Sequence, residues 1–77
     1  MSEILFPMMT GDADEPGVLA TWYVADGDVV AEKHLLAEVS IDKVDAEIYA
    51  PVAGTVRLRV AEGDEVAQGA VIAVIEP

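Results

Sequence analysis

Apolar and polar residues alternate along much of this chain, a pattern typical of β-strands with one buried face. In the segment 55–60 every second residue is apolar, namely Val56, Leu58 and Val60. The same alternation in the segment 18–24 predicts a buried face made of Val18, Ala20, Trp22 and Val24. Further strands are predicted at 4–6, 35–41, 44–50 and 71–75. Glycines and prolines separate these runs, and no interval between them predicts a helix.

The chain contains an internal repeat. Residues 24–31 (VADGDVVA) match residues 60–67 (VAEGDEVA) at an offset of 36 positions. Gly69 in the second copy indicates a turn in both copies, so 28–34 is predicted as a short strand and a turn. Each copy alone is too small to bury its apolar face, and the two together predict a β-sandwich or flattened barrel with an approximate twofold axis. The predicted core consists of Val18, Trp22, Val24, Leu36, Val39, Ile48, Val56, Leu58, Val60, Ile72 and Val74.

Length and composition exclude several classes of function. The 77 residues predict a single domain over 1–77. Fifteen acidic and four basic residues give a net charge of −11, which argues against binding to nucleic acid or to an anionic membrane. The chain has no cysteine and a single histidine, His34, which excludes thiolate nucleophiles and multi-histidine metal sites. No apolar run reaches the roughly 20 residues of a membrane-spanning helix, and 1–6 lacks the basic residues of a signal peptide.

Asp42 and Lys43 form a predicted two-residue turn between the strands 35–41 and 44–50. The tip of a tight hairpin is an exposed and well-defined position for a side chain. The repeat offset carries Lys43 beyond the last residue, so the turn is expected at the opposite end of the domain from the C-terminus. A protonated surface lysine is a poor catalyst, but it can be the attachment point for a group that another enzyme activates. The alternative interpretation is a solvated lysine without a function.

The remaining polar motifs predict no catalytic residue and no metal site. Acidic residues at 26–28 recur at 62–64 in the second copy, which indicates a turn rather than a calcium site. The acidic segment 12–15 lacks the ligand spacing of a calcium loop. Ser2 and Ser40 have no nucleophile-elbow sequence around them. A chain this small, without a nucleophile or an acid–base pair, is expected to be a carrier or binding module rather than an enzyme on its own.

One series of residues extends over almost the whole chain: Pro7, Gly17, Trp22, Tyr23, Val24, Gly27, Asp28, Leu36, Val39, Asp42, Lys43, Ala50, Pro51, Gly54 and Gly63. In this order and spacing the series resembles a lipoyl domain of the biotinyl/lipoyl-attachment family. It is most similar to the lipoyl domain of the dihydrolipoamide acyltransferase component of 2-oxo acid dehydrogenase complexes. The Asp42-Lys43 pair is specific because it stands at the hairpin between two copies of a repeat.

The resemblance implies both a fold and a function. The fold would be an all-β flattened barrel of two four-stranded antiparallel sheets with quasi-twofold symmetry. Lys43 would carry lipoic acid in amide linkage, with Asp42 and Val44 as flanking turn residues that a lipoyl-protein ligase recognises. This swinging arm would take an acyl group from a thiamine-diphosphate-dependent decarboxylase, pass it to coenzyme A at the acyltransferase core and be reoxidised by dihydrolipoyl dehydrogenase. The loop 8–16 would lie near the lysine and help the decarboxylase to recognise its carrier.

The resemblance also leaves alternatives open. The domain is expected to be monomeric and cytoplasmic, with the mitochondrial matrix as the alternative location. Ser40-Ile41 replaces the usual Glu-Thr, and 7–22 is one residue longer than usual, so the 2-oxo acid is not defined. Because the chain stops at Pro77, it is expected to be either an excised domain or a free-standing carrier. The alternative functions are a biotin carboxyl carrier, although Asp42 and Val44 replace the methionines usual beside its lysine, and an unmodified protein-binding β-sandwich.

Overall fold

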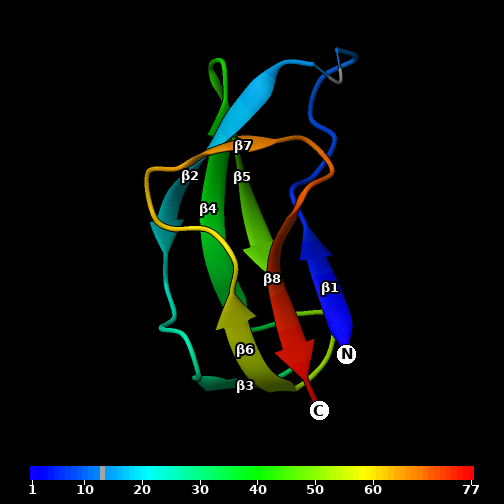
Figure 1. Cartoon of the computed structure of the whole chain (residues 1–77), viewed down its shortest axis with the longest axis vertical. Helices are drawn as coiled ribbons and strands as arrows, with labels where there is room; N and C mark the ends of the chain where they lie inside the picture. The colour runs from blue at the N-terminus through cyan, green and yellow to red at the C-terminus, as the bar shows by residue number, and fades with distance from the viewer. Residues whose placement is uncertain (13) are drawn as a thin grey trace.

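The computed structural model describes residues 1–12 and 14–77. Within these residues there are eight strands and no helix (Figure 1). The strands are β1 (Ser2–Leu5), β2 (Pro16–Trp22), β3 (Val29–Val30), β4 (Leu35–Ile41), β5 (Val44–Tyr49), β6 (Gly54–Leu58), β7 (Glu65–Ala67) and β8 (Val71–Glu76). The predicted strands and the predicted turn in 28–34 are confirmed, with bounds that differ by one or two residues.

The eight strands form two four-stranded antiparallel sheets. The sheet with the order β1–β8–β6–β3 contains both terminal strands and is called the terminal sheet here. The sheet with the order β5–β4–β2–β7 contains the β4–β5 hairpin and is called the hairpin sheet. The expected all-β architecture of two four-stranded antiparallel sheets is confirmed.

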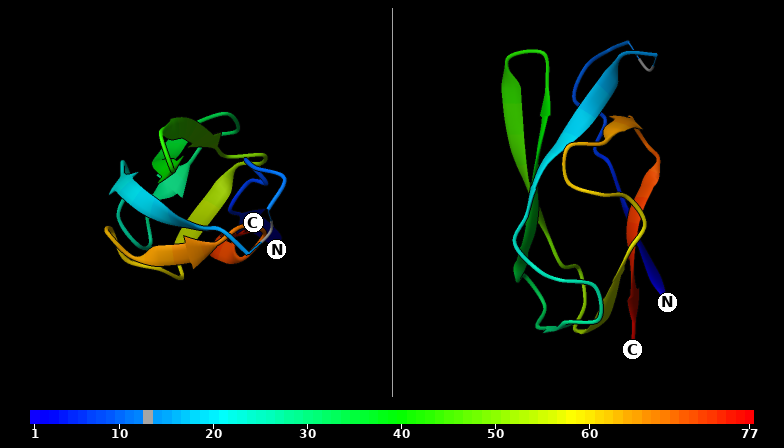
Figure 2. Two further views of the ribbon diagram at one scale, coloured as in Figure 1. Left: turned by 90° about the horizontal axis from the view of Figure 1, so that it is seen from above. Right: turned by 60° about the vertical axis from the view of Figure 1, so that its left-hand side comes forward.

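The molecule is elongated, with principal extents of 33 × 19 × 18 Å. Both chain termini lie at one end of the long axis, and the tip of the β4–β5 hairpin lies at the other (Figure 1). The right-hand view of Figure 2 shows the same separation. The position that the internal repeat predicts for the turn, remote from the C-terminus, is therefore confirmed.

Apolar side chains from both sheets form one buried cluster. Four predicted core residues are fully buried in it: Leu36, Val39, Val56 and Ile72. Five others are partly buried and pack against it: Trp22, Val24, Ile48, Leu58 and Val60. The largest buried side chains that the predicted core lacked are Phe6, Leu19, Ile41 and Ile75.

One of the predicted core positions is wrong. Val18 is 38% exposed, whereas its neighbour Leu19 is completely buried. The pairing of β2 with β4 shifts register between Leu19 and Thr21, and this irregularity reverses the inward face partway along the strand. Val74 is buried as predicted, at 6% exposed, but it lies outside the central cluster, because it pairs with the outward-facing Glu3 and Arg57 on the outer surface of the terminal sheet.

The two copies of the repeat make equivalent hydrogen bonds, which confirms the approximate twofold symmetry. The Gly27 amide donates to the Val56 carbonyl at 2.7 Å, and the Gly63 amide donates to the Leu19 carbonyl at 2.7 Å. The Leu58 amide donates to Asp26, as the Trp22 amide donates to Glu62 in the other half. Each copy therefore closes its turn onto a strand of the other copy, and the halves depend on each other for folding.

Candidate functional site

The β4–β5 hairpin ends in a two-residue turn made of Asp42 and Lys43. Ile41 and Val44 are the last paired residues of the hairpin, and Ser40 pairs with Asp45 next to them. Asp42 has φ 54°, a positive value that both favoured types of two-residue hairpin turn require at their first central position. Aspartate tolerates this region better than most residues because its short polar side chain can hydrogen-bond to the nearby backbone. The backbone conformation of the turn thus explains why an aspartate precedes the lysine.

The base of this turn is held firmly by packing. β4 is an inner strand with β5 on one side and β2 on the other. Val39 is completely buried, and Ile41 is only 2% exposed although it comes directly before the turn. Protein interiors are close-packed, so a strand buried up to its last residue resists bending. The hairpin therefore presents its tip in a fixed position relative to the body of the domain.

The Lys43 side chain is exposed at this tip. Within residues 1–12 and 14–77 the one salt bridge joins Arg57 to Glu76, so the Lys43 ammonium has no ion-pair partner there. The other lysine in the sequence is Lys33, and it is also exposed at a turn, with φ 72°. That turn links β3 to β4, and β3 lies at the end of the molecule that carries the termini (Figure 1). The two lysines thus differ in position rather than in exposure.

Acidic side chains dominate the hairpin that carries Lys43. The segment 35–49 holds four carboxylates and one ammonium group. Glu38 and Glu47 are direct cross-strand partners, a like-charge pair that weakens the hairpin slightly. The Tyr49 hydroxyl donates a 2.8 Å hydrogen bond to Glu47, and this bond raises the pKa of Tyr49 above its ordinary value. The hairpin consequently offers a negative surface that suits a partner with basic side chains.

The β1–β2 loop lies at the same end of the molecule as the hairpin (Figure 2). The expectation that 8–16 lies near the lysine is met as far as the shared end of the molecule, and Ala13 lies outside the described residues. Gln68, which directly follows β7, is the main anchor of the loop. The side chain of Gln68 is buried and hydrogen-bonds to Met9, Thr10, Asp12 and Glu15.

Sequence reasoning did not identify Gln68 as a structural residue. The available signal was the comparison of the two repeat copies, in which Gln68 stands at the position of Glu32. Glu32 is exposed, whereas Gln68 is only 8% exposed. A polar residue that becomes buried in one copy only indicates a contact that only this half makes.

The other candidate motifs have structural roles in the described residues. Asp28 and Asp64 occupy equivalent turns and each accepts a 2.8 Å hydrogen bond from a backbone amide three residues earlier. Asp12 accepts a 3.0 Å hydrogen bond from the Asp14 amide, which forms a local turn. No group of three or more histidine, aspartate or glutamate side chains suits a metal ion in 1–12 and 14–77. The same residues include no helix with the length and hydropathy needed to span a membrane.

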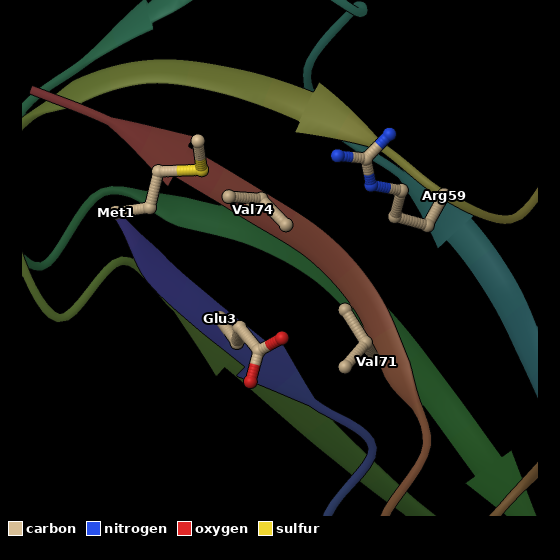
Figure 3. A pocket seen from close by; sticks show the side chains of 5 residues that line it. All are labelled: Met1, Glu3, Arg59, Val71 and Val74. Carbon is tan, nitrogen blue, oxygen red and sulfur yellow. The ribbon is translucent and has the colours of Figure 1, made fainter.

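A shallow hollow of about 660 Å³ lies on the outer surface of the terminal sheet (Figure 3). It is lined by Met1, Glu3, Arg59, Val71 and Val74. These residues lie in or next to β1, β6 and β8 of the terminal sheet, whereas Lys43 lies in the turn between β4 and β5 of the hairpin sheet. The hollow is therefore separate from the candidate site and adds no group to it.

Comparison with known proteins defines the class. Residues 2–75 match the Biotin_lipoyl family, described as "Biotin-requiring enzyme". Because the match covers nearly the whole chain, the chain belongs to this family. The solution structure of the lipoyl domain of the 2-oxoglutarate dehydrogenase complex from Azotobacter vinelandii has the same fold, with a TM-score of 0.81 over 99% of this chain and 98% of that domain, at 23% identity.

Sequence relatives point to one component of a large complex. The dihydrolipoyllysine-residue acetyltransferase component of the pyruvate dehydrogenase complex from Corynebacterium glutamicum is 48% identical over 64 residues, which is 82% of this chain and 10% of that protein. The component of the same name from Staphylococcus aureus is 40% identical over 67 residues, which is 86% of this chain and 16% of that protein. The chain is thus a carrier domain of the lipoyl type, homologous to a small part of these acetyltransferases.

Proposed function

We propose that this domain carries lipoic acid in amide linkage to Nζ of Lys43 and works as the acyl carrier of a 2-oxo acid dehydrogenase complex. The observation that carries the proposal is the exposed Lys43 amine, without an ion-pair partner in the described residues, at the tip of a hairpin with a buried base. An amide bond to Nζ needs only an accessible amine, so the site fits the group. When bound, lipoic acid supplies a disulfide that accepts an acyl group with an electron pair, gives the acyl group to coenzyme A and returns the electron pair to the flavin of dihydrolipoyl dehydrogenase.

The residues of the chain contribute presentation and recognition rather than chemistry. β4 and β5 hold Lys43 away from the body of the domain, so that the reactive end of the arm can enter an active site of a partner. Asp42 in the turn and Val44, the first residue of β5, are the residues that a lipoyl-protein ligase contacts beside the target amine. Tethering to a domain raises the local concentration of the arm at each partner active site. The partners are a thiamine-diphosphate-dependent decarboxylase, an acyltransferase core and dihydrolipoyl dehydrogenase.

The acyl group is an acetyl group derived from pyruvate in this proposal. The support is the 48% and 40% identity to acetyltransferase components of pyruvate dehydrogenase complexes. The isolated domain acts as a monomer, and its location is the cytoplasm, where bacterial complexes of this kind and their ligases meet.

Lipoylation in vitro tests the attachment site directly. The chain is incubated with a lipoyl-protein ligase, lipoate and ATP, and intact mass and peptide mapping then report the adduct. We expect one lipoyl group on the unaltered chain, one on Lys33→Gln and none on Lys43→Gln. Lys33→Gln is the matched control because it removes the other exposed turn lysine. Lys43→Gln should melt at the same temperature as the unaltered chain, since a turn tip buries little surface.

The same assay separates the competing functions. Modification by a biotin–protein ligase with biotin, and not by the lipoyl ligase, would establish a biotin carboxyl carrier. A chain that neither ligase modifies would be an unmodified protein-binding module. The lipoylated chain is next incubated with a pyruvate dehydrogenase decarboxylase component and pyruvate, or with a 2-oxoglutarate dehydrogenase decarboxylase component and 2-oxoglutarate. An acetyl adduct in the first mixture alone supports the pyruvate assignment, and a succinyl adduct in the second alone overturns it.

A further inference from the structure

We propose that Gln68 is a positioning residue, which keeps the β1–β2 loop in one shape at the end of the molecule that carries the tip of the β4–β5 hairpin, so that the decarboxylase component meets a pre-formed surface. The inference rests on the proposed function, because it concerns how the carrier is recognised. It assigns a role to a residue that lies in neither the hairpin nor the loop.

The hydrogen bonds of Gln68 all go to the loop. Oε1 of Gln68 accepts from the Met9 amide at 2.7 Å and from the Thr10 amide at 3.0 Å. Nε2 donates to Oγ1 of Thr10 at 3.1 Å, to the Asp12 carbonyl at 2.7 Å and to the Glu15 carbonyl at 3.0 Å. One side chain thus joins the start and the end of the loop, although Gln68 is more than 50 positions away from each of them in sequence.

Only a side-chain amide of this length satisfies both sets of partners. The two loop amides need an acceptor, and the two loop carbonyls need a donor, so the anchor must present both. An ionised glutamate accepts but does not donate, and it would stand against two carbonyl oxygens. Gln68 is 8% exposed, and removal of its amide would leave loop groups without partners in a place that water reaches poorly.

The approximate symmetry shows that the anchor belongs to one half only. The Gly69 amide donates to the Phe6 carbonyl at 2.8 Å, and the Lys33 amide donates to the Ala50 carbonyl at 2.7 Å in the other half. Phe6 and Ala50 are thus equivalent positions, and each is followed by a connection to a strand. The connection from Ala50 to Gly54 has only residues 51–53, whereas the connection from Phe6 to Gly17 has residues 7–16. The longer connection and the buried glutamine occur together, in the half whose short strand, β7, lies toward the hairpin (Figure 1).

The anchored loop has a surface that suits recognition. Its residues Asp12 and Asp14 are exposed, so the loop adds negative charge to the end of the molecule that carries the acidic hairpin. A loop that is already ordered loses less conformational entropy when a partner binds. Loss of the anchor should therefore weaken binding to the decarboxylase, without altering the amine or its turn.

The test uses lipoylated chains with the pyruvate dehydrogenase decarboxylase component and pyruvate, and it measures the rate of acetyl transfer against carrier concentration. The variant is Gln68→Met, which keeps the length and volume of the side chain but loses its hydrogen bonds. The matched control is Glu32→Met at the equivalent position of the other half. For Gln68→Met we expect KM for the carrier to rise about tenfold with kcat nearly unchanged. The reason is that the conformational entropy lost when one or two loop residues become ordered on binding weakens affinity by about that factor. The control should keep both constants.

Two further measurements separate positioning from general damage. Lipoylation by the ligase should proceed at the same rate in Gln68→Met, because the ligase acts on the hairpin. Hydrogen exchange at the Met9 and Thr10 amides should accelerate in this variant, while amides of the core strands keep their protection. If Gln68→Met fails to fold, Thr10→Val removes the bond from Nε2 of Gln68 together with the two bonds between Oγ1 of Thr10 and the Asp12 backbone, and it is expected to raise KM in the same direction.

The outcomes distinguish the inference from the proposed function. An unaltered lipoylated chain that accepts no acyl group from either decarboxylase component contradicts the proposed function. If the unaltered chain is acetylated and Gln68→Met shows the same KM, the carrier function stands and the positioning role of Gln68 is wrong. A fall in kcat without a change in KM also overturns it, because the arm rather than the docking surface would then be affected.

Discussion

The ring of Phe6 lies directly on the backbone of Gly17. A Cβ atom added to Gly17 would come within 2.1 Å of Cζ of Phe6. Phe6 is 1% exposed, and its backbone also hydrogen-bonds to Gly69 and Ala70. The two residues flank the β1–β2 loop, so this close contact brings the two ends of the loop together in the core.

The first prediction follows from this contact. Gly17→Ala should destabilise the domain by about 1–3 kcal/mol, because the ring must move in a close-packed core. The measurement is thermal or urea unfolding monitored by Trp22 fluorescence. Gly11→Ala is the matched control, since an added Cβ there meets no atom within 4 Å. Equal stability of the two variants would show that the core accommodates the methyl group at Gly17.

The second prediction concerns the position of the lysine in the turn. Exchange of Asp42 and Lys43 would place a lysine at φ 54° and change the direction of its side chain. Exchange of Lys43 and Val44 would move the amine onto β5. Both double variants should fold, but both should be lipoylated much more slowly, because the ligase depends on the geometry of the tip. Rapid lipoylation of both, measured by intact mass over time, would show that geometry is not recognised.

The third prediction uses the two equivalent turns of the repeat. Gly27 has φ 91° and Gly63 has φ 89°, and neither would bring an added Cβ closer than 3.4 Å to another residue. Backbone strain, rather than a clash, therefore sets the cost of substitution. Gly27→Val and Gly63→Val should each lower the free energy of unfolding by about 1–2 kcal/mol. Chemical denaturation measures both, and a large difference between them would mean that the two turns are not energetically equivalent.

The fourth prediction is a pH effect on the hairpin. The hydrogen bond from Tyr49 to Glu47 raises the pKa of Tyr49, so the folded state favours the neutral phenol. The stability that this bond provides is present below the pKa of the unfolded chain, about 10, and is lost as the pH rises through the folded value. In an ultraviolet titration of Tyr23→Phe, Tyr49 should ionise at a higher pH than in the double variant that also carries Glu47→Gln. Coincident curves would mean that the bond is not formed in solution.

Much of the fold could be predicted from the sequence because the alternation of apolar residues and the internal repeat predicted the same strands and turns. The alternation in 55–60 predicted the inward residues of β6 correctly, and the repeat predicted the turn in 28–34 where a single copy was ambiguous. At the start of β2 the prediction was wrong, since it placed Val18 on the buried face. The register shift that exposes Val18 depends on the pairing of β2 with β4, and the alternation of apolar and polar residues does not reveal it.

In the candidate site, too, some features follow from the local sequence and others depend on tertiary contacts. The turn at Asp42 and Lys43 follows from local sequence, since the strands on either side fix its length. The anchoring by Gln68 depends on contacts more than 50 positions away, and a lone glutamine in a sequence does not indicate whether it is buried. Tertiary contacts of this kind become visible only when the strands are assembled.

The domain is 33 Å long, with both chain ends at one pole and the turn between β4 and β5 at the other, and this arrangement has a practical use. A fluorescent protein, a bead or a glass surface coupled through either terminus would stand about one domain length from the acceptor amine. If the proposed function is correct, immobilised or labelled versions should therefore still accept lipoate, which would allow the proposed transfers to be followed on single molecules.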